Sequence, residues 1–151
     1  MKSGNYGRFA LMMVISFIIM YAVMFLNAFQ FDHVMLSTMR TYMTVLMISA
    51  MAIVMLLFMW GMYKNKVANI AILVISLLVF GTTYYMMRNQ TGISDIQYMK
   101  GMIPHHSSAI LTSEQADLKN PETQQLAKEI IDAQKREIAQ MKELISRLEN
   151  E

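Results

Sequence analysis

Three long apolar runs dominate the first part of the chain, at residues 9–26, 42–60 and 67–85, and none of them contains a charged side chain. A helix needs roughly 20 apolar residues to cross about 30 Å of hydrocarbon, so the runs predict three transmembrane helices in a membrane domain of residues 1–88. Basic residues precede the first run, as in a secretory signal. Because no small-residue cleavage motif follows it, we expect a retained anchor.

The polarity of the chain changes sharply after residue 88. Every acidic residue except Asp32 lies in the remaining segment, residues 89–151, which we interpret as a separate helical domain. Hydrophobic positions recur there every three or four residues, which is the period of amphipathic helices. The 55% hydrophobic content of the whole chain, too high for an ordinary soluble domain, therefore comes mainly from the apolar runs.

Two helix-start signals divide the polar domain. Ser94 and Gln97 form a capping box, and the sequence Asn-Pro-Glu at residues 120–122 supplies a cap, a first-turn proline and a carboxylate that favours a helix N-terminus. We therefore predict helices at about residues 95–117 and 121–149. A link of three residues would join them into an antiparallel hairpin.

The short loops indicate how the chain crosses the membrane, because Lys and Arg prefer the cytoplasmic side. Lys2 and Arg8 precede the first run, and Lys64 and Lys66 lie between the second and third runs. We expect a multi-pass protein of the cell (inner) membrane with a cytoplasmic N-terminus. Its C-terminal domain would then be periplasmic or extracellular, a setting with which the absence of cysteine is compatible.

The first helix of the hairpin contains the sequence MKGMIPHH, which brings metal-ligating side chains together. At 100° per residue, Met99, Met102 and His106 share an arc of about 60°, with His105 one step further round. Pro104 removes one backbone hydrogen bond and usually bends a helix. We therefore expect the two histidines to point differently from their directions in an ideal helix.

The second helix of the hairpin adds a carboxylate to this set. Glu137 lies on the apolar stripe, where the helical pattern calls for a hydrophobic residue, and Met141 follows it by one turn. Folding the hairpin at its link brings Glu137 about level with Met99 and Met102. Alternatively, Glu137 could pair with Lys100 across the hairpin.

This set of side chains predicts a metal site. Thioethers with imidazole suit Cu(I), and imidazole with carboxylate also suits Cu(II) or zinc, so copper is the expected ion and zinc the second candidate. Methionines at helical spacing also serve as core filler, which leaves packing as the alternative interpretation. The predicted metal ligands are Met99, Met102, His105, His106, Glu137 and Met141.

The same residues carry a resemblance to a known family. The block MIPHH at residues 102–106 and a later block of the form Q..EI..M resemble the hallmarks of the family called domain of unknown function 305. The second block consists of Gln134, Glu137, Ile138 and Met141. The family is a ferritin-like helical module, often found in exported bacterial proteins, and some members are associated with copper binding or copper tolerance. The resemblance covers about residues 94–146 and implies a copper-binding hairpin.

Seven methionines recur at a spacing of four along the second apolar run and the residues before it. They are Met35, Met39, Met43, Met47, Met51, Met55 and Met59. Each step of four residues advances about 40° round a helix, so the row winds and cannot form one straight stripe. One interpretation is a series of thioethers that passes a soft ion along or across the membrane. The other is a flexible, polarizable packing surface.

Other functional classes lack their sequence signatures. The chain has no Glu-x-x-His pair of a di-iron bundle, no P-loop and no nucleophile elbow, so we expect no enzyme. The net charge is only +2, and the basic residues are scattered over an amphipathic helix. We therefore expect no basic surface that binds nucleic acid.

Two functions from different classes remain open for an all-α protein of this kind. The first is a membrane-anchored extracytoplasmic protein that binds copper for buffering, delivery or tolerance, with the metal ion and membrane lipid as partners. The second is a structural or interaction module whose methionines only pack. In both cases two helices cannot enclose a core, so we expect a homo-oligomer, most simply a dimer that completes a four-helix bundle.

Overall fold

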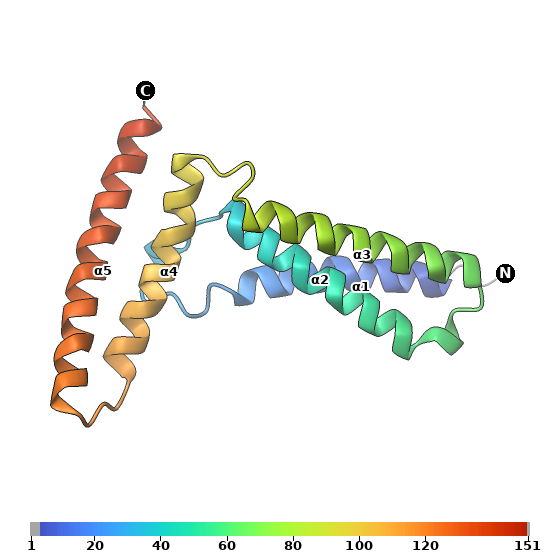
Figure 1. Cartoon of the computed structure of the whole chain (residues 1–151), viewed down its shortest axis with the longest axis horizontal. Helices are drawn as coiled ribbons and strands as arrows, with labels where there is room; N and C mark the ends of the chain where they lie inside the picture. The colour runs from blue at the N-terminus through green and yellow to red at the C-terminus, as the bar shows by residue number, and fades with distance from the viewer. Residues whose placement is uncertain (1–3, 151) are drawn as a thin grey trace. The chain divides into compact units, whose positions relative to one another are not determined.

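The computed structural model describes residues 4–150 and contains, within that range, only helices and the loops that join them (Figure 1). The predicted all-helical class is confirmed. The chain divides into two compact units: Met1–Val23 with Met39–Gly92, and Met24–Thr38 with Ile93–Glu151. The loop after the first apolar helix lies within the predicted membrane domain, yet it packs with the C-terminal hairpin.

The first unit contains α1 (Gly4–Val23), α2 (Thr38–Phe58) and α3 (Lys66–Arg88). All three helices are long and apolar enough to cross a membrane, as the hydrophobic runs predict. Their ends differ from the predicted ends by up to five residues. Hydropathy marks the apolar part of a helix, whereas the backbone hydrogen bonds continue through polar residues at its ends. The helix α1 stops earlier than expected because the chain turns at Phe25, whose carbonyl accepts a hydrogen bond from the Ala28 N–H (3.1 Å).

Apart from Leu56, the buried side chains of α2 and α3 are small or polar. They include Thr44, Ser49 and Ala52 on α2, and Asn69, Ser76 and Thr83 on α3. The hydroxyls of Thr44 and Ser49 each donate to a backbone carbonyl of their own helix at 2.9 Å, which satisfies the two buried donors. Small residues let helices approach closely, as is typical of helix association in lipid.

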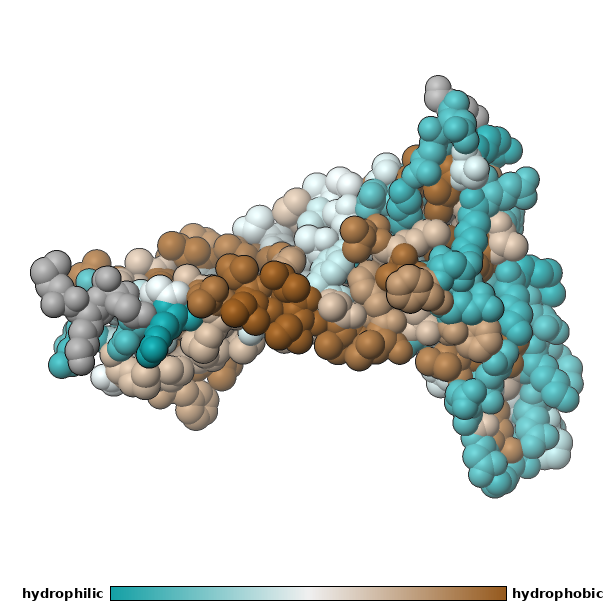
Figure 2. Space-filling view, turned by 180° about the vertical axis from the view of Figure 1, so that it is seen from behind, coloured by the Kyte–Doolittle hydropathy of each residue, from teal (hydrophilic) through white to brown (hydrophobic). Residues whose placement is uncertain are grey.

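Large apolar side chains point outward from all three apolar helices. Ile18 on α1 is 61% exposed, and Leu78 on α3 is exposed to a similar extent. Figure 2 shows that hydrophobic residues dominate the visible surface of the apolar helices, whereas hydrophilic residues dominate that of the hairpin. An apolar surface of this extent is unusual in water and ordinary against hydrocarbon.

The methionine row changes its surroundings along its length. Met35, which precedes α2, packs against the core of the second unit, whereas Met55 and Met59 pack against the core of the first unit. Met43 between them is 41% exposed. The seven thioethers therefore do not share one surface, because Met35 lies before α2 and belongs to the other unit.

The second unit is built on an antiparallel hairpin of α4 (Asp95–Gln115) and α5 (Pro121–Leu148), which lie side by side (Figure 1). The predicted cap of α4 forms, because the Ser94 side chain accepts from the Gln97 N–H at 3.3 Å. The expected capping box is not completed, because the Gln97 side chain does not bond back to the Ser94 N–H. Its side-chain oxygen instead accepts from the backbone N–H and the hydroxyl of Thr38, at 2.9 and 3.0 Å.

The hairpin encloses a small core together with the loop of residues 24–38. Met99, Ile103 and Ile110 of α4 are buried against Ile138 and Ile145 of α5. The loop adds partly buried side chains, among them Phe29 and Met35. At the far end of the hairpin, Asn120 caps α5 by accepting from the Thr123 N–H at 3.1 Å, and Pro121 occupies the first turn, as predicted.

Candidate metal site between α4 and α5

A groove of about 480 Å³ runs between α4 and α5 and collects most of the predicted ligands. Met99, Met102 and His106 line it from α4, and Glu137 and Met141 line it from α5. The remaining lining residues are Asp95, Tyr98, Gln140, Leu144 and Leu148. Three thioethers, an imidazole and a carboxylate therefore border one apolar space.

His106 and Glu137 face one another across this groove. The Nδ1 atom of His106 lies 3.2 Å from Oε2 of Glu137. The two atoms do not meet the geometry of a hydrogen bond, and Nδ1 is buried with no hydrogen-bond partner among the described residues. The His106 side chain is 12% exposed, whereas the Glu137 side chain is half exposed. A buried polar atom without a partner is costly, and such atoms often mark a site for an ion or water.

The surroundings of His106 favour its neutral form. Burial lowers the pKa of His106 below its ordinary value; the Glu137 carboxylate opposes this effect, and His105 adds to it. A neutral imidazole carries a lone pair on one ring nitrogen, which is the form that binds a metal.

His105 does not line the groove. It is exposed on α4, and its ring centroid lies 6.0 Å from that of His106. The helix α4 continues through Pro104, which is buried, so the two histidines diverge mainly because consecutive residues on a helix point about 100° apart. Of the six predicted ligands, the structure brings five together and places His105 outside.

The register of the hairpin differs from the expected one. Glu137 is not level with Met99 but lies against His106, and Lys100 pairs with Glu149 at 2.6 Å rather than with Glu137. The link comprises residues 116–120 instead of three residues and is extended at both ends. In addition, helical side chains lean toward the N-terminus of their own helix, which displaces contacts between antiparallel helices.

The donor set decides which metals fit the groove. Among the described residues, no three His, Asp or Glu side chains gather as a metal site, and the chain has no cysteine. Zinc sites are built from thiolates, imidazoles and carboxylates, so this groove offers zinc too few donors. A metal held here would depend on the thioethers of Met99, Met102 and Met141, which suit a soft ion.

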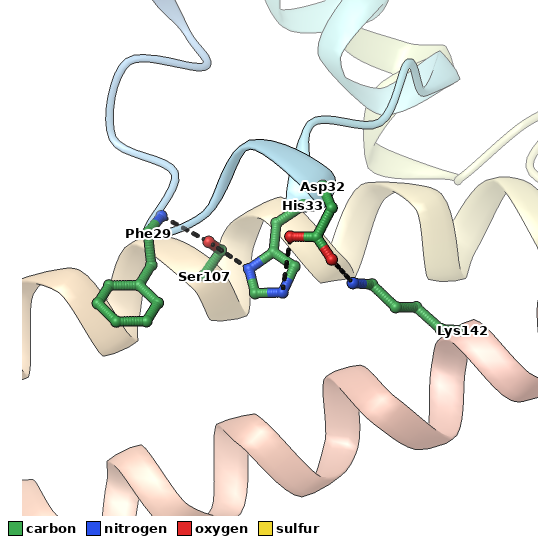
Figure 3. Close-up of polar contacts among 5 residues, drawn as sticks. All are labelled: Phe29, Asp32, His33, Ser107 and Lys142. Carbon is green, nitrogen blue, oxygen red and sulfur yellow. Dashed lines mark hydrogen bonds and ion pairs between the residues drawn. The ribbon is translucent and has the colours of Figure 1, made fainter.

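A second group of side chains, which the sequence analysis missed, ties the loop of residues 24–38 to α4 and α5 (Figure 3). The Ser107 hydroxyl accepts from the Phe29 N–H at 2.7 Å and lies 2.9 Å from Nδ1 of His33. Because the oxygen already accepts one hydrogen bond, its own proton is available to the imidazole nitrogen. Asp32, next to His33, pairs with Lys142 of α5.

These residues form a structural connection and not a nucleophilic site. Ser107 is fully buried, so no substrate reaches its oxygen. The His33 Nε2 atom lies 3.8 Å from the Asp32 carboxylate, beyond hydrogen-bond distance. One signal could have revealed the connection. The loop contains three phenylalanines and the apolar run Val-Met-Leu, and so many apolar side chains are seldom all left exposed to solvent.

The comparisons with known proteins agree with the resemblance carried by the two motif blocks. The family described as "Domain of unknown function (DUF305)" matches residues 86–150. "Uncharacterized protein L153" of Acanthamoeba polyphaga mimivirus is 34% identical over 147 residues, which covers 93% of this chain and 93% of that protein. No solved structure matches the chain.

The two matches differ in extent. The family match begins near the end of α3 and runs through the whole hairpin, including every residue of the groove. The similarity to the viral protein covers nearly the whole chain, so it also includes most of the three apolar helices. The chain therefore belongs to the DUF305 family, with the family domain in its C-terminal region.

Proposed function

We propose that this protein is a membrane-anchored copper-binding protein and that the groove between α4 and α5 holds Cu(I). The observation that carries the proposal is the convergence of Met99, Met102, Met141 and His106 on one groove. Thioethers and imidazole are the donors that suit Cu(I), and a thioether stays available where a thiol would be oxidised. Glu137 would balance part of the charge of the ion.

The groove also meets the physical demands of such a site. Its walls include Leu144 and Leu148, which exclude water and favour a soft ion over a strongly hydrated one. Met99 is held in the core of the hairpin, so its thioether is positioned before any metal arrives. Nδ1 of His106 makes no hydrogen bond among the described residues and lies 3.2 Å from the Glu137 carboxylate, so an ion bound there would contact both groups.

The location follows from the proposed orientation. With a cytoplasmic N-terminus and three spans, the hairpin lies on the extracytoplasmic side, which is periplasmic if the protein resides in a bacterial inner membrane. Copper buffering, delivery or tolerance on that side is the role that fits a metal groove anchored next to a bilayer.

A titration of the full chain in detergent micelles tests the proposal. The full chain is required because the loop of residues 24–38 forms part of the second unit. Cu(I) is added under anaerobic, reducing conditions in competition with a chromogenic chelator, and we expect one Cu(I) bound per chain. Replacing Met99, Met102 and Met141 together by leucine keeps nearly the same volume and removes the sulfur atoms, so binding should be lost while the fold remains.

Two matched controls sharpen this test. Met35→Leu removes a thioether from the same core but outside the groove and should leave Cu(I) binding unchanged. His106→Ala should weaken binding roughly tenfold or more, equivalent to about 1.4 kcal/mol or more, whereas His105→Ala should have little effect. A parent chain that binds Cu(I) no better than the triple leucine variant would contradict the proposal.

The alternative is an interaction module in which the same side chains only pack. The exposed positions of Tyr98 and Leu126 on the hairpin favour it, because a two-helix unit leaves apolar surface uncovered. A second copy packed on this surface would complete a four-helix bundle. In that case the triple leucine variant would assemble like the parent and neither chain would bind metal.

A further inference from the structure

The loop of residues 24–38 exposes three large apolar side chains. Phe31 is 92% exposed, Leu26 79% and Leu36 70%. Single exposed hydrophobic residues are ordinary on protein surfaces, but three within eleven positions of one short loop are not. The largest of them, Phe31, is the most exposed.

The opposite side of this loop is held by the hairpin. Within the short helix Phe31–His33, the His33 side chain is buried against Ser107, and Asp32 is paired with Lys142 (Figure 3). A further contact is the hydrogen bond from Asn27 to the Ser108 hydroxyl at 2.9 Å. Asn27, Asp32 and His33 therefore contact α4 or α5, whereas Phe31 is exposed.

Both ends of the loop continue into candidate membrane spans. Leu26 follows the end of α1 by three residues, and Leu36 precedes the start of α2 by two. If these helices cross a bilayer, both ends of the loop leave it at the level of the lipid headgroups. Aromatic side chains are enriched at that level, where an apolar ring meets the boundary between hydrocarbon and water.

We propose that the loop of residues 24–38 rests in the lipid interface, with Phe31 inserted among the headgroups between the anchoring positions Leu26 and Leu36. The partner of this surface is the bilayer itself. The loop then binds lipid with one face and α4 with the other, so it holds the hairpin at the membrane. This proposal does not depend on metal binding.

Site-directed spin labelling of the full chain tests the proposal directly. The chain contains no cysteine, so Phe31→Cys provides a unique attachment site for a nitroxide without further substitutions. The labelled protein is placed in phosphatidylcholine nanodiscs, and power saturation compares collisions with oxygen, which concentrates in lipid, and with a water-soluble nickel chelate. Labels at Ile18, on the outward face of α1, and at Lys119, with its side chain 80% exposed on the hairpin link, provide the lipid and water references.

We expect the label at position 31 to favour oxygen over nickel several-fold more than the label at 119, and less than the label at 18. Nickel accessibility equal to that at 119 would overturn the proposal. Protection from both reagents would overturn it as well, because the ring would then be covered by protein, such as a second copy. A label at Leu36 supplies an independent reading with the same outcomes if the Phe31 variant fails to fold.

Discussion

Replacing Ser107 by alanine removes one hydroxyl from the contact between the loop of residues 24–38 and α4. Ser107 is fully buried and serves two partners at once, the Phe29 N–H at 2.7 Å and the His33 imidazole at 2.9 Å. Alanine fits the same space but bonds with neither. The variant therefore measures how strongly this single oxygen holds the loop to the hairpin.

The expected magnitude follows from these contacts. A buried polar group that loses its partner costs about 1–3 kcal/mol, and the Phe29 N–H, being only partly buried, lies in the lower half of that range. The Phe29 N–H then contributes about 1–2 kcal/mol and the buried His33 nitrogen about 1–3, so the two losses together amount to about 2–5 kcal/mol. The free energy that docks the loop should therefore fall by about 2–5 kcal/mol.

Hydrogen exchange of the loop amides in the full chain, in detergent micelles, provides the assay. A loss of about 2 kcal/mol in the free energy of opening speeds exchange roughly 30-fold. Ser108→Ala is the matched control, because the Ser108 hydroxyl accepts only the exposed hydrogen bond from Asn27. Because that bond is exposed, its loss should weaken docking by only about 0.5 kcal/mol. Equal exchange in the two variants would refute the role assigned to Ser107.

Three further predictions concern pH, orientation and assembly. Burial first and the Lys142 cation second lower the pKa of His33, with Asp32 opposing, so the docked loop favours the neutral imidazole. Docking should be at full strength above the ordinary histidine pKa of about 6.5 and should weaken as the pH falls below it. Hydrogen exchange of the loop amides, corrected for its intrinsic pH dependence, measures the strength of docking. The His33→Gln variant should not show the pH dependence. A reporter enzyme fused after residue 151 should be active outside the cytoplasm, and cytoplasmic activity would contradict the proposed orientation. Sedimentation of the full chain in detergent should show a dimer, and a monomer at every concentration would argue against bundle completion.

The features predicted correctly from the sequence depend on neighbouring residues. Each apolar run is long enough by itself to identify a candidate span. The caps at Ser94 and Asn120 need only the backbone of the following turn, and Pro121 fits the first turn wherever the hairpin lies. The motif blocks identified the family for the same reason, because each is contained within a few helical turns.

The features that were missed depend on residues far apart in the chain. The side chain of Gln97 completes no capping box because Thr38, 59 residues away, offers it two donors. The register that sets His106 against Glu137 is determined by how far the link extends before α5 begins, and periodicity contains no information on that length. Likewise, Phe29 packs against the core of the hairpin, which is distant in sequence, so the residues next to Phe29 do not reveal its partial burial.

The loop and the groove are connected through the rotation of α4. His106 and Ser107 are consecutive, so their side chains point about 100° apart, one into the groove and the other toward the loop. Any rotation of the helix that withdraws Ser107 from Phe29 and His33 also turns His106 away from Glu137. One orientation of the α4 backbone therefore determines both the contact of His106 with Glu137 and the contact of Ser107 with the loop. A loop that contributes no lining residue to the groove still determines where its imidazole points.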